Sequence, residues 1–104
     1  MRVLIPGHRY ELSNFENKDK VGQTIQFIQK EPKQEGSTEL VIISDGTTNE
    51  ELLEVLIDRI SFLNSKFPCR ENAIAITKLD EALLWLNKRT NDRIKRNVEG
   101  KQLV

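Results

Sequence analysis

The fold is decided by residues 48–96, TNEELLEVLIDRISFLNSKFPCRENAIAITKLDEALLWLNKRTNDRIKR, a stretch dominated by helical periodicity. It opens with a capping box, in which the Thr48 hydroxyl accepts a hydrogen bond from the backbone N–H three residues later and Glu51 reaches back. Pro68 has no backbone N–H and disfavours helical geometry at Phe67, so the first helix ends there. We therefore predict two long helices joined by a tight break around Pro68.

Each predicted helix carries one apolar stripe, whose members recur every three or four residues. In the first helix the stripe consists of Leu52, Leu53, Leu56, Ile57, Ile60 and Leu63. In the second helix it consists of Asn72, Ala75, Ile76, Leu79, Ala82, Leu83 and Leu86. The two stripes can cover each other only if the helices fold back antiparallel, so we predict a helical hairpin.

Four large apolar residues lie off these stripes. At about 100° per residue, Val55 and Phe62 lie about 140° from the centre of the first stripe. Ile74 and Trp85 share a line on the second helix, well away from its stripe. Two interpretations stay open: the rest of the chain covers these four residues, or other protomers or a ligand cover them, because large exposed apolar groups cluster at interfaces.

The residues before the hairpin predict short strands. Residues 8–15 and, most clearly, 22–30 alternate in character, whereas 38–44 is an apolar run suited to a central or covered strand. Residues 31–37 contain a proline and a glycine, and this composition predicts a loop. Three short strands with short connections predict an antiparallel meander, one face of which can pack on the hairpin.

Length and composition fit one small domain. The chain has 104 residues, of which 38% are apolar and 31% charged, so its hydrophobic core is small. Domains of this size commonly gain further stability by forming oligomers. The predicted fold class is α+β. Within the single domain we expect a small antiparallel sheet, a long antiparallel helical hairpin and a tail, in residues 1–46, 47–98 and 99–104 respectively.

Charge and cysteine content restrict the environment and the partners. The formal net charge is zero, so we predict no DNA partner and no membrane partner. The N-terminal run is too short for a signal peptide, and no apolar run is long enough to span a bilayer. A single cysteine, Cys69, rules out an internal disulfide and indicates a reducing compartment. We therefore expect a cytosolic protein.

Patterns for catalysis or metal binding are missing from the sequence. One histidine, His8, and one cysteine, Cys69, cannot build a zinc site. No glycine-rich phosphate loop is present, and no nucleophile lies beside a base, so we interpret Cys69 as a turn or packing residue. The absence of these patterns from the sequence favours a binding protein over an enzyme, and we expect no cofactor and no metal.

The two helices carry opposite charge where the ends of the hairpin meet. Residues 50–58 hold four acids and no base. The end of the sequence is basic, with Lys88, Arg89, Arg93, Lys95, Arg96 and Lys101 against only Asp92 and Glu99. Trp85, Arg89 and Arg93 are spaced four apart and share one side. Two interpretations stay open. An aromatic ring with arginines suits a base and a phosphate, or the tryptophan lies in an intersubunit core while the arginines pair with the acids.

One block of sequence is distinctive: FPCRENAIAITKLDEALLWLNKRTNDR (67–93), continuing to VEG (98–100). Together with DGTTNEE (45–51) and HRYELSNF (8–15), it resembles the phage Thoeris anti-defence proteins of the first type, which share a helical hairpin with the phage anti-CBASS sponges. The resemblance covers nearly the whole chain. It implies a sponge that holds intact the cyclic ADP-ribose isomers (gcADPR) made by TIR-domain proteins, in the host bacterial cytoplasm. Some members also hold cyclic trinucleotides at separate sites in a hexamer.

The resemblance also implies ligand-binding residues. The family's pocket positions match Phe62, Asn72 and Arg89, and an arginine in an early strand matches Arg9. Arg93, on the side of the helix that carries Arg89, is a further candidate. Asn72 and Arg89 are 17 residues apart on one helix, or about 25 Å, so no small ligand touches both in one protomer. This spacing predicts antiparallel pairing of protomers, with two equivalent sites per dimer.

Three points stay open at this stage. Candidates for a cyclic-trinucleotide site are Arg70 and Arg96, although a structural salt bridge is an equal expectation for Arg70. The function is also open: a gcADPR sponge is the first hypothesis, and a sponge that binds mainly cyclic oligonucleotides is the second. A third, from another class, is a structural helical-hairpin oligomer without a ligand, such as a phage assembly factor. The expected assembly is a homo-oligomer, either a dimer or a hexamer.

Overall fold

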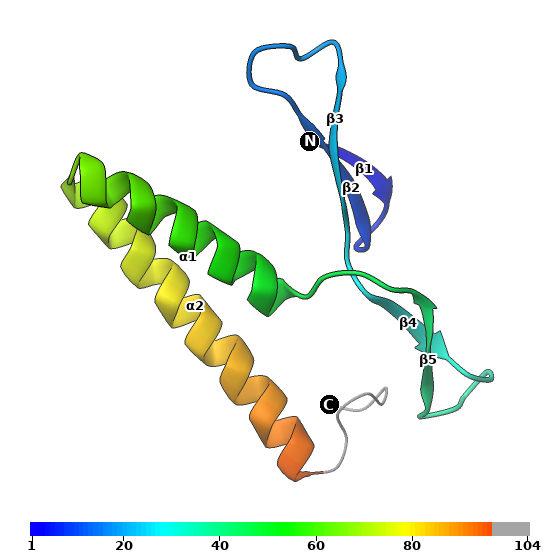
Figure 1. Ribbon diagram of the computed structural model, residues 1–104. Coiled ribbons are helices and arrows are strands. Elements are labelled where there is room, and N and C mark those ends of the chain that lie inside the picture. The colour runs from blue at the N-terminus through cyan, green and yellow to red at the C-terminus, as the bar shows by residue number, and fades with distance from the viewer. Residues whose placement is uncertain (97–104) are drawn as a thin grey trace. The chain divides into compact units, whose positions relative to one another are not determined.

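The chain divides into two compact units in the computed structural model, which describes residues 1–96 (Figure 1). One unit is Met1–Thr48 and contains the strands, and the other begins at Asn49 and contains the helices. The predicted tail at 99–104, and the last two residues of the predicted hairpin, 97–98, lie outside the described residues. Placement of both units in a single domain stays a prediction.

The strand unit contains two small antiparallel sheets. The first holds β1 (Arg2–Ile5), β2 (Arg9–Ser13) and β3 (Val21–Gln26) in the order β1-β2-β3. The second holds β4 (Gln29–Pro32) and β5 (Leu40–Ser44). The α+β class is therefore confirmed, with strands first and helices second.

β1 was not predicted. It pairs with β2 through Arg2 opposite Glu11 and Val3 opposite Tyr10, and the Arg2 guanidinium lies 3.1 Å from the Glu11 carboxylate. A turn at Gly7, whose φ is +79°, reverses the chain between the two strands. The signal that sequence reasoning overlooked is the run of β-formers directly before the Pro6-Gly7 turn.

The predicted strand at 22–30 is divided in the structure, so the meander of three strands is wrong in this detail. The backbone N–H groups change their hydrogen-bond acceptors between Phe27 and Ile28. Phe27 N–H donates to the His8 carbonyl at 2.8 Å, whereas Ile28 N–H donates to the Thr47 carbonyl at 2.9 Å. The two halves then join different sheets, and β4 takes up the first two residues of the predicted loop.

β5 corrects a second expectation. Its apolar run was suited to a central or covered strand, but β5 pairs only with β4 within residues 1–96. Val41, Ile42 and Ile43 remain exposed. A two-stranded sheet has no central strand, and one of this size is marginally stable on its own.

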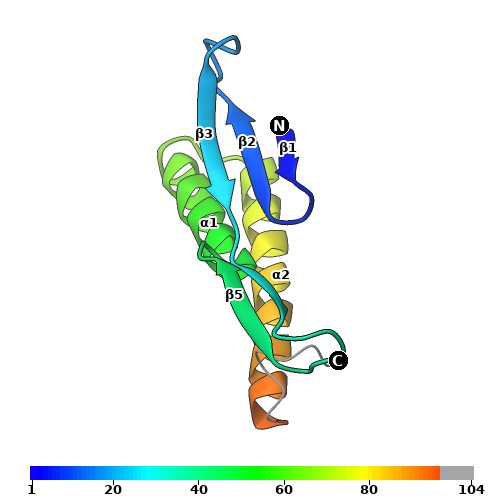
Figure 2. The ribbon, with the colours of Figure 1, turned by 90° about the vertical axis from the view of Figure 1, so that its right-hand side faces the viewer.

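The helical unit is an antiparallel hairpin of α1 (Asn49–Lys66) and α2 (Arg70–Lys95). The two helices contact each other, and both views show them side by side (Figures 1 and 2). α1 begins directly after Thr48 and ends directly before Phe67-Pro68, as the capping box and the proline predict. α2 has 26 residues and α1 has 18, so about two turns of α2 extend past the start of α1.

Cys69 is a capping residue of the hairpin turn. Its Sγ accepts a hydrogen bond from the backbone N–H of Asn72 at 3.4 Å, and its own N–H donates to Asn64 Oδ1 at 3.0 Å. These two bonds satisfy backbone donors where a helix start leaves them without intrahelical partners. The prediction of a turn role for Cys69 is confirmed.

The apolar stripes face each other in the hairpin. The half-buried positions of α1 are Glu50, Leu52, Leu53, Ile57, Ile60 and Asn64. Those of α2 are Asn72, Ala75, Ile76, Leu79, Leu83, Leu86, Thr90 and Asp92. Three members of the predicted stripes are exposed: Leu56, Leu63 and Ala82. No apolar side chain among residues 1–96 is fully buried, so each helix keeps much of its apolar surface in contact with solvent. None of the described helices is long and apolar enough to cross a membrane.

Candidate functional site

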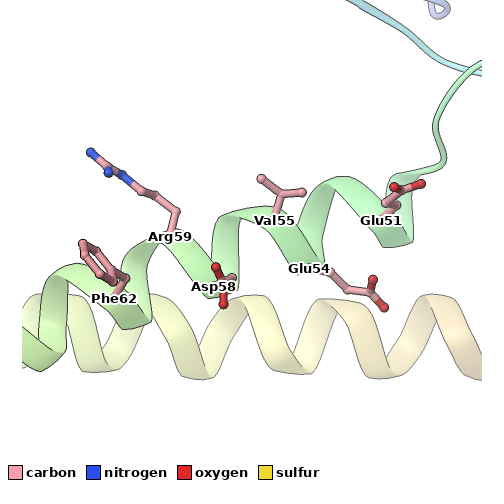
Figure 3. Close-up of a pocket in the computed structure, with 6 residues that line it drawn as sticks. All are labelled: Glu51, Glu54, Val55, Asp58, Arg59 and Phe62. Atoms are coloured by element: carbon pink, nitrogen blue, oxygen red, sulfur yellow. The ribbon is translucent and has the colours of Figure 1, made fainter.

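An open groove runs along α1 on the side that the apolar stripe does not occupy (Figure 3). We call it the α1 groove. It has a volume of about 540 Å³ and is lined by Glu51, Glu54, Val55, Asp58, Arg59 and Phe62. Val55 and Phe62 are exposed, as their off-stripe angles predict. The groove therefore combines two apolar side chains with three carboxylates and one guanidinium.

Phe62 contributes an aromatic ring to the α1 groove. Its side chain is 53% exposed, and the Lys66 ammonium lies 4.7 Å from the centroid of the ring. A cation at this distance interacts favourably with the face of the ring. An aromatic ring that remains half exposed can stack on a nucleobase, because every base offers a π face. Lys66 was missed from the sequence, although its i+4 spacing from Phe62 was a signal for this contact.

A second pocket lies near the end of α2, and we call it the α2-end pocket. Its volume is about 270 Å³, and it is lined by Trp85, Lys88, Arg89, Asp92 and Arg96. Trp85 is 61% exposed. Three cations and one carboxylate surround the indole, so the pocket is basic. The predicted association of an aromatic residue with arginines is present for Trp85, Arg89 and Arg96.

Lys88 and Asp92 form an ion pair inside this pocket, with Nζ 2.6 Å from Oδ2. The hydrogen bond from Lys88 holds the pKa of the Asp92 carboxyl below its ordinary value. Lys88 thus pairs with an acid of its own helix rather than with an acid of α1. Arg89 forms no ion pair or hydrogen bond within the described part of the chain, so its guanidinium is available to an anion.

Arg93 is not part of the α2-end pocket. Its side chain is only 5% exposed, which makes it the one buried charged residue among residues 1–96. The spacing Leu79, Leu83, Leu86, Thr90, Arg93 continues the half-buried line of α2, with steps of three and four residues. Extension of the apolar stripe by about two turns past Leu86 would have placed Arg93 on the inner side, apart from Arg89.

The remaining sequence-predicted residues are not among those that line these two pockets. Asn72 is half buried in the first turn of α2, at the tip of the hairpin. Arg9 lies in β2, opposite Gln26, with an exposed side chain. Because Asn72 and Arg89 both belong to the continuous helix α2, their separation along it is about 25 Å. One hairpin therefore holds the candidate residues at its two ends.

Arg70 lines a third pocket on the outer side of α2. This pocket has a volume of about 430 Å³ and is also lined by Ala73, Ile74, Thr77 and Lys78. Arg70 forms no ion pair with any residue in the described part of the chain, so the structural salt bridge is not observed there. No group of three or more potential metal ligands occurs within residues 1–96.

Comparisons with known proteins agree with this architecture. The family model described as the Acb2/Tad1 hairpin domain matches residues 18–91, which include Phe62, Asn72 and Arg89 but not Arg9 or Arg93. A curated relative, Thoeris anti-defense 1 from Bacillus phage SBSphiJ7, is 59% identical over 58 residues. That match covers 55% of this chain but only 41% of the relative. The resemblance to the Thoeris anti-defence proteins is thereby confirmed, and the chain belongs to the Acb2/Tad1 hairpin-domain family.

Proposed function

We propose that the protein is an anti-defence sponge, which binds and sequesters cyclic ADP-ribose-type immune signals such as gcADPR without cleaving them. One observation carries this proposal: a single hairpin presents an exposed aromatic ring at Phe62 and an available guanidinium at Arg89, too far apart to serve one ligand alone. The relative named Thoeris anti-defense 1 supports the anti-defence role. The site of action would be the host bacterial cytoplasm, where TIR-domain proteins make the signal.

The complete site would form between two antiparallel copies of the hairpin. In that arrangement Phe62 and Asn72 of one protomer approach Arg89 of the partner subunit, and a two-fold axis generates two equivalent sites. The charges support such a pairing. The α1 groove carries three carboxylates against one guanidinium, whereas the α2-end pocket carries three cations against one carboxylate. Complementary potentials of this kind set the register of an interface.

The chemistry of such a site suits sequestration. The Phe62 ring stacks on adenine, and guanidinium groups form charge-assisted, bidentate hydrogen bonds with the diphosphate. No step in this scheme makes or breaks a covalent bond. A sponge acts by lowering the free signal concentration. It must therefore be present in excess over the signal and bind it tightly enough to hold the free concentration below the Kd of the receptor.

Recovery of the ligand tests the proposal. The purified protein is mixed with gcADPR, separated from free ligand, and heated to release what it holds. We expect unmodified gcADPR in an amount that approaches one molecule per site, and less from a Phe62→Ala protein. A hydrolysed product would make the protein an enzyme, and no retained ligand would contradict the sponge.

A second candidate function is the binding of cyclic trinucleotides at a separate site, in a dimer or a hexamer. The observation that favours it is the third pocket, where Arg70 and Lys78 flank the exposed Ile74. Calorimetry with gcADPR and with a cyclic trinucleotide separates the two, because loss of Arg70 would weaken only the latter. A hairpin oligomer that binds neither ligand would be structural, as expected of an assembly factor.

A further inference from the structure

Arg59 is the one cation of the α1 groove, and it lies beside Phe62. The two residues are three positions apart, which makes them neighbours on one side of a helix. Figure 3 shows both side chains extending from the side of α1 that points away from α2. A ring and a guanidinium are therefore presented together by one helix of one protomer.

The Arg59 guanidinium is not engaged elsewhere. Its side chain is exposed, and it forms no ion pair or hydrogen bond within the part of the chain that the structure describes. This holds although a carboxylate, Asp58, is next to it in sequence; Figure 3 shows that the two side chains leave α1 in different directions. A planar guanidinium with five donors can bind two phosphate oxygens at once.

The position of Lys66 determines which part of the Phe62 ring a base can stack on. Its ammonium lies over the Phe62 ring, but Lys66 does not line the α1 groove. The ring surface that contributes to the groove is thus free of the lysine, and a base stacked there lies next to Arg59. Lys66 at i+4 and Arg59 at i−3 flank the ring along the helix.

The acids of the groove orient an anionic ligand. One of its three acids, Asp58, is next to Arg59 in sequence, but its side chain leaves α1 in a different direction (Figure 3). The other two, Glu51 and Glu54, lie towards the start of α1, about one to two turns from Arg59, and both are exposed. A diphosphate is repelled from that end and attracted to the guanidinium, and low salt strengthens both effects. The charge gradient along one helix favours a single direction of binding.

We infer that Arg59 binds the diphosphate of the nucleotide whose base stacks on Phe62. This inference rests on the proposed function, and it adds to the site a phosphate contact from the protomer that supplies the ring. Arg89 of the partner subunit then closes the site from the opposite side. The specificity that follows is for a base and a phosphate held close together, as in a cyclised ADP-ribose.

Calorimetric titration of gcADPR into the wild-type protein, Arg59→Ala and Arg59→Gln tests this inference. We expect both variants to bind about tenfold to a hundredfold more weakly, the usual effect of losing a charge-assisted hydrogen bond. The matched control is Lys18→Ala, an equal change of net charge at an exposed loop position, with affinity unchanged within about twofold. The ³¹P resonances of the bound diphosphate should also shift between wild type and Arg59→Gln.

The outcomes separate the two proposals. If the wild-type protein binds gcADPR and both Arg59 variants bind within about twofold of it, the inference is overturned while the sponge stands. If the wild-type protein binds no gcADPR, the proposed function fails. Thermal unfolding of each variant shows whether it is folded, and the ³¹P shifts report contact with the phosphates directly.

Discussion

The α1 groove and the α2-end pocket are built from similar parts but differ in charge. Each surrounds one exposed aromatic side chain, Phe62 or Trp85. The groove is acidic apart from Arg59, whereas the pocket is basic apart from Asp92. Both regions offer a stacking surface, but the α1 groove supplies only one cation whereas the α2-end pocket supplies three. Because their charges are complementary, we propose that the two regions of neighbouring protomers contribute to one site rather than form duplicate sites.

Removal of the Arg89 guanidinium should have the largest effect on the affinity for gcADPR. Arg89→Ala should weaken gcADPR binding by about tenfold to a hundredfold or more, because charge-assisted hydrogen bonds to phosphate contribute about 1.5–3 kcal/mol. Isothermal titration measures the change. The control is Lys95→Ala, an exposed cation of the same helix outside the α2-end pocket, with near wild-type affinity. An Arg89→Ala protein with full affinity and a lowered Tm would instead show a structural arginine.

Removal of the ring from the groove should have the next largest effect. Phe62→Ala removes the stacking surface, and base–aromatic stacking contributes about 1–3 kcal/mol, so affinity should fall about fivefold to a hundredfold. Phe62→Tyr keeps the ring and should restore most of the affinity, in the same titration. Equal loss in both variants would show that the ring serves packing between protomers and not the base.

Leu83 and Leu84 are adjacent in sequence but lie on the inner and outer sides of the hairpin, so their substitution compares how much each side contributes to stability. Leu83 is half buried against α1, whereas Leu84 is 66% exposed. Leu83→Ala should lower the free energy of unfolding by about 1–2 kcal/mol, and Leu84→Ala by less than about 0.5 kcal/mol if nothing covers it. Urea denaturation measures both. A large effect at Leu84 that grows with protein concentration would reveal an interface there.

At the hairpin tip we expect a smaller loss of stability than for Leu83→Ala. Cys69→Ala removes the side chain that accepts the Asn72 N–H, and loss of such a cap costs about 0.5–1 kcal/mol. Cys69→Ser provides a stronger acceptor and should equal or exceed the wild type in thermal unfolding. If alanine is as stable as serine, the capping bond contributes nothing measurable.

The hairpin could be predicted from sequence because its signals are local. Pro68 ends α1, the apolar spacing defines the inner side, and simple helical angles place Val55, Phe62, Ile74 and Trp85 outside it. The strands were predicted less well, since pairing depends on distant residues. Nothing within residues 22–30 specifies that Phe27 bonds to His8 while Ile28 bonds to Thr47. That exchange of partners decides where β3 ends and β4 begins.

The candidate site was predictable only in part. Phe62, Arg89 and Trp85 could be placed from spacing, because exposure on a helix follows from angle. Arg59 and Lys66 could have been placed in the same way, at i−3 and i+4 from Phe62, although the sequence prediction did not include them. The burial of Arg93 also follows from the inner stripe, once the stripe is extended past Leu86.

The central claim is that Phe62 of one protomer and Arg89 of the partner subunit bind one ligand together. The most direct test is to co-refold Phe62→Ala and Arg89→Ala proteins at equal amounts, neither of which binds gcADPR tightly alone, and to count tight sites by titration. Two-fold pairing predicts that each mixed dimer regains one intact site, so about a quarter of all sites recover. No recovery in a mixture shown to contain mixed dimers would contradict the claim, because both residues would then act within a single protomer.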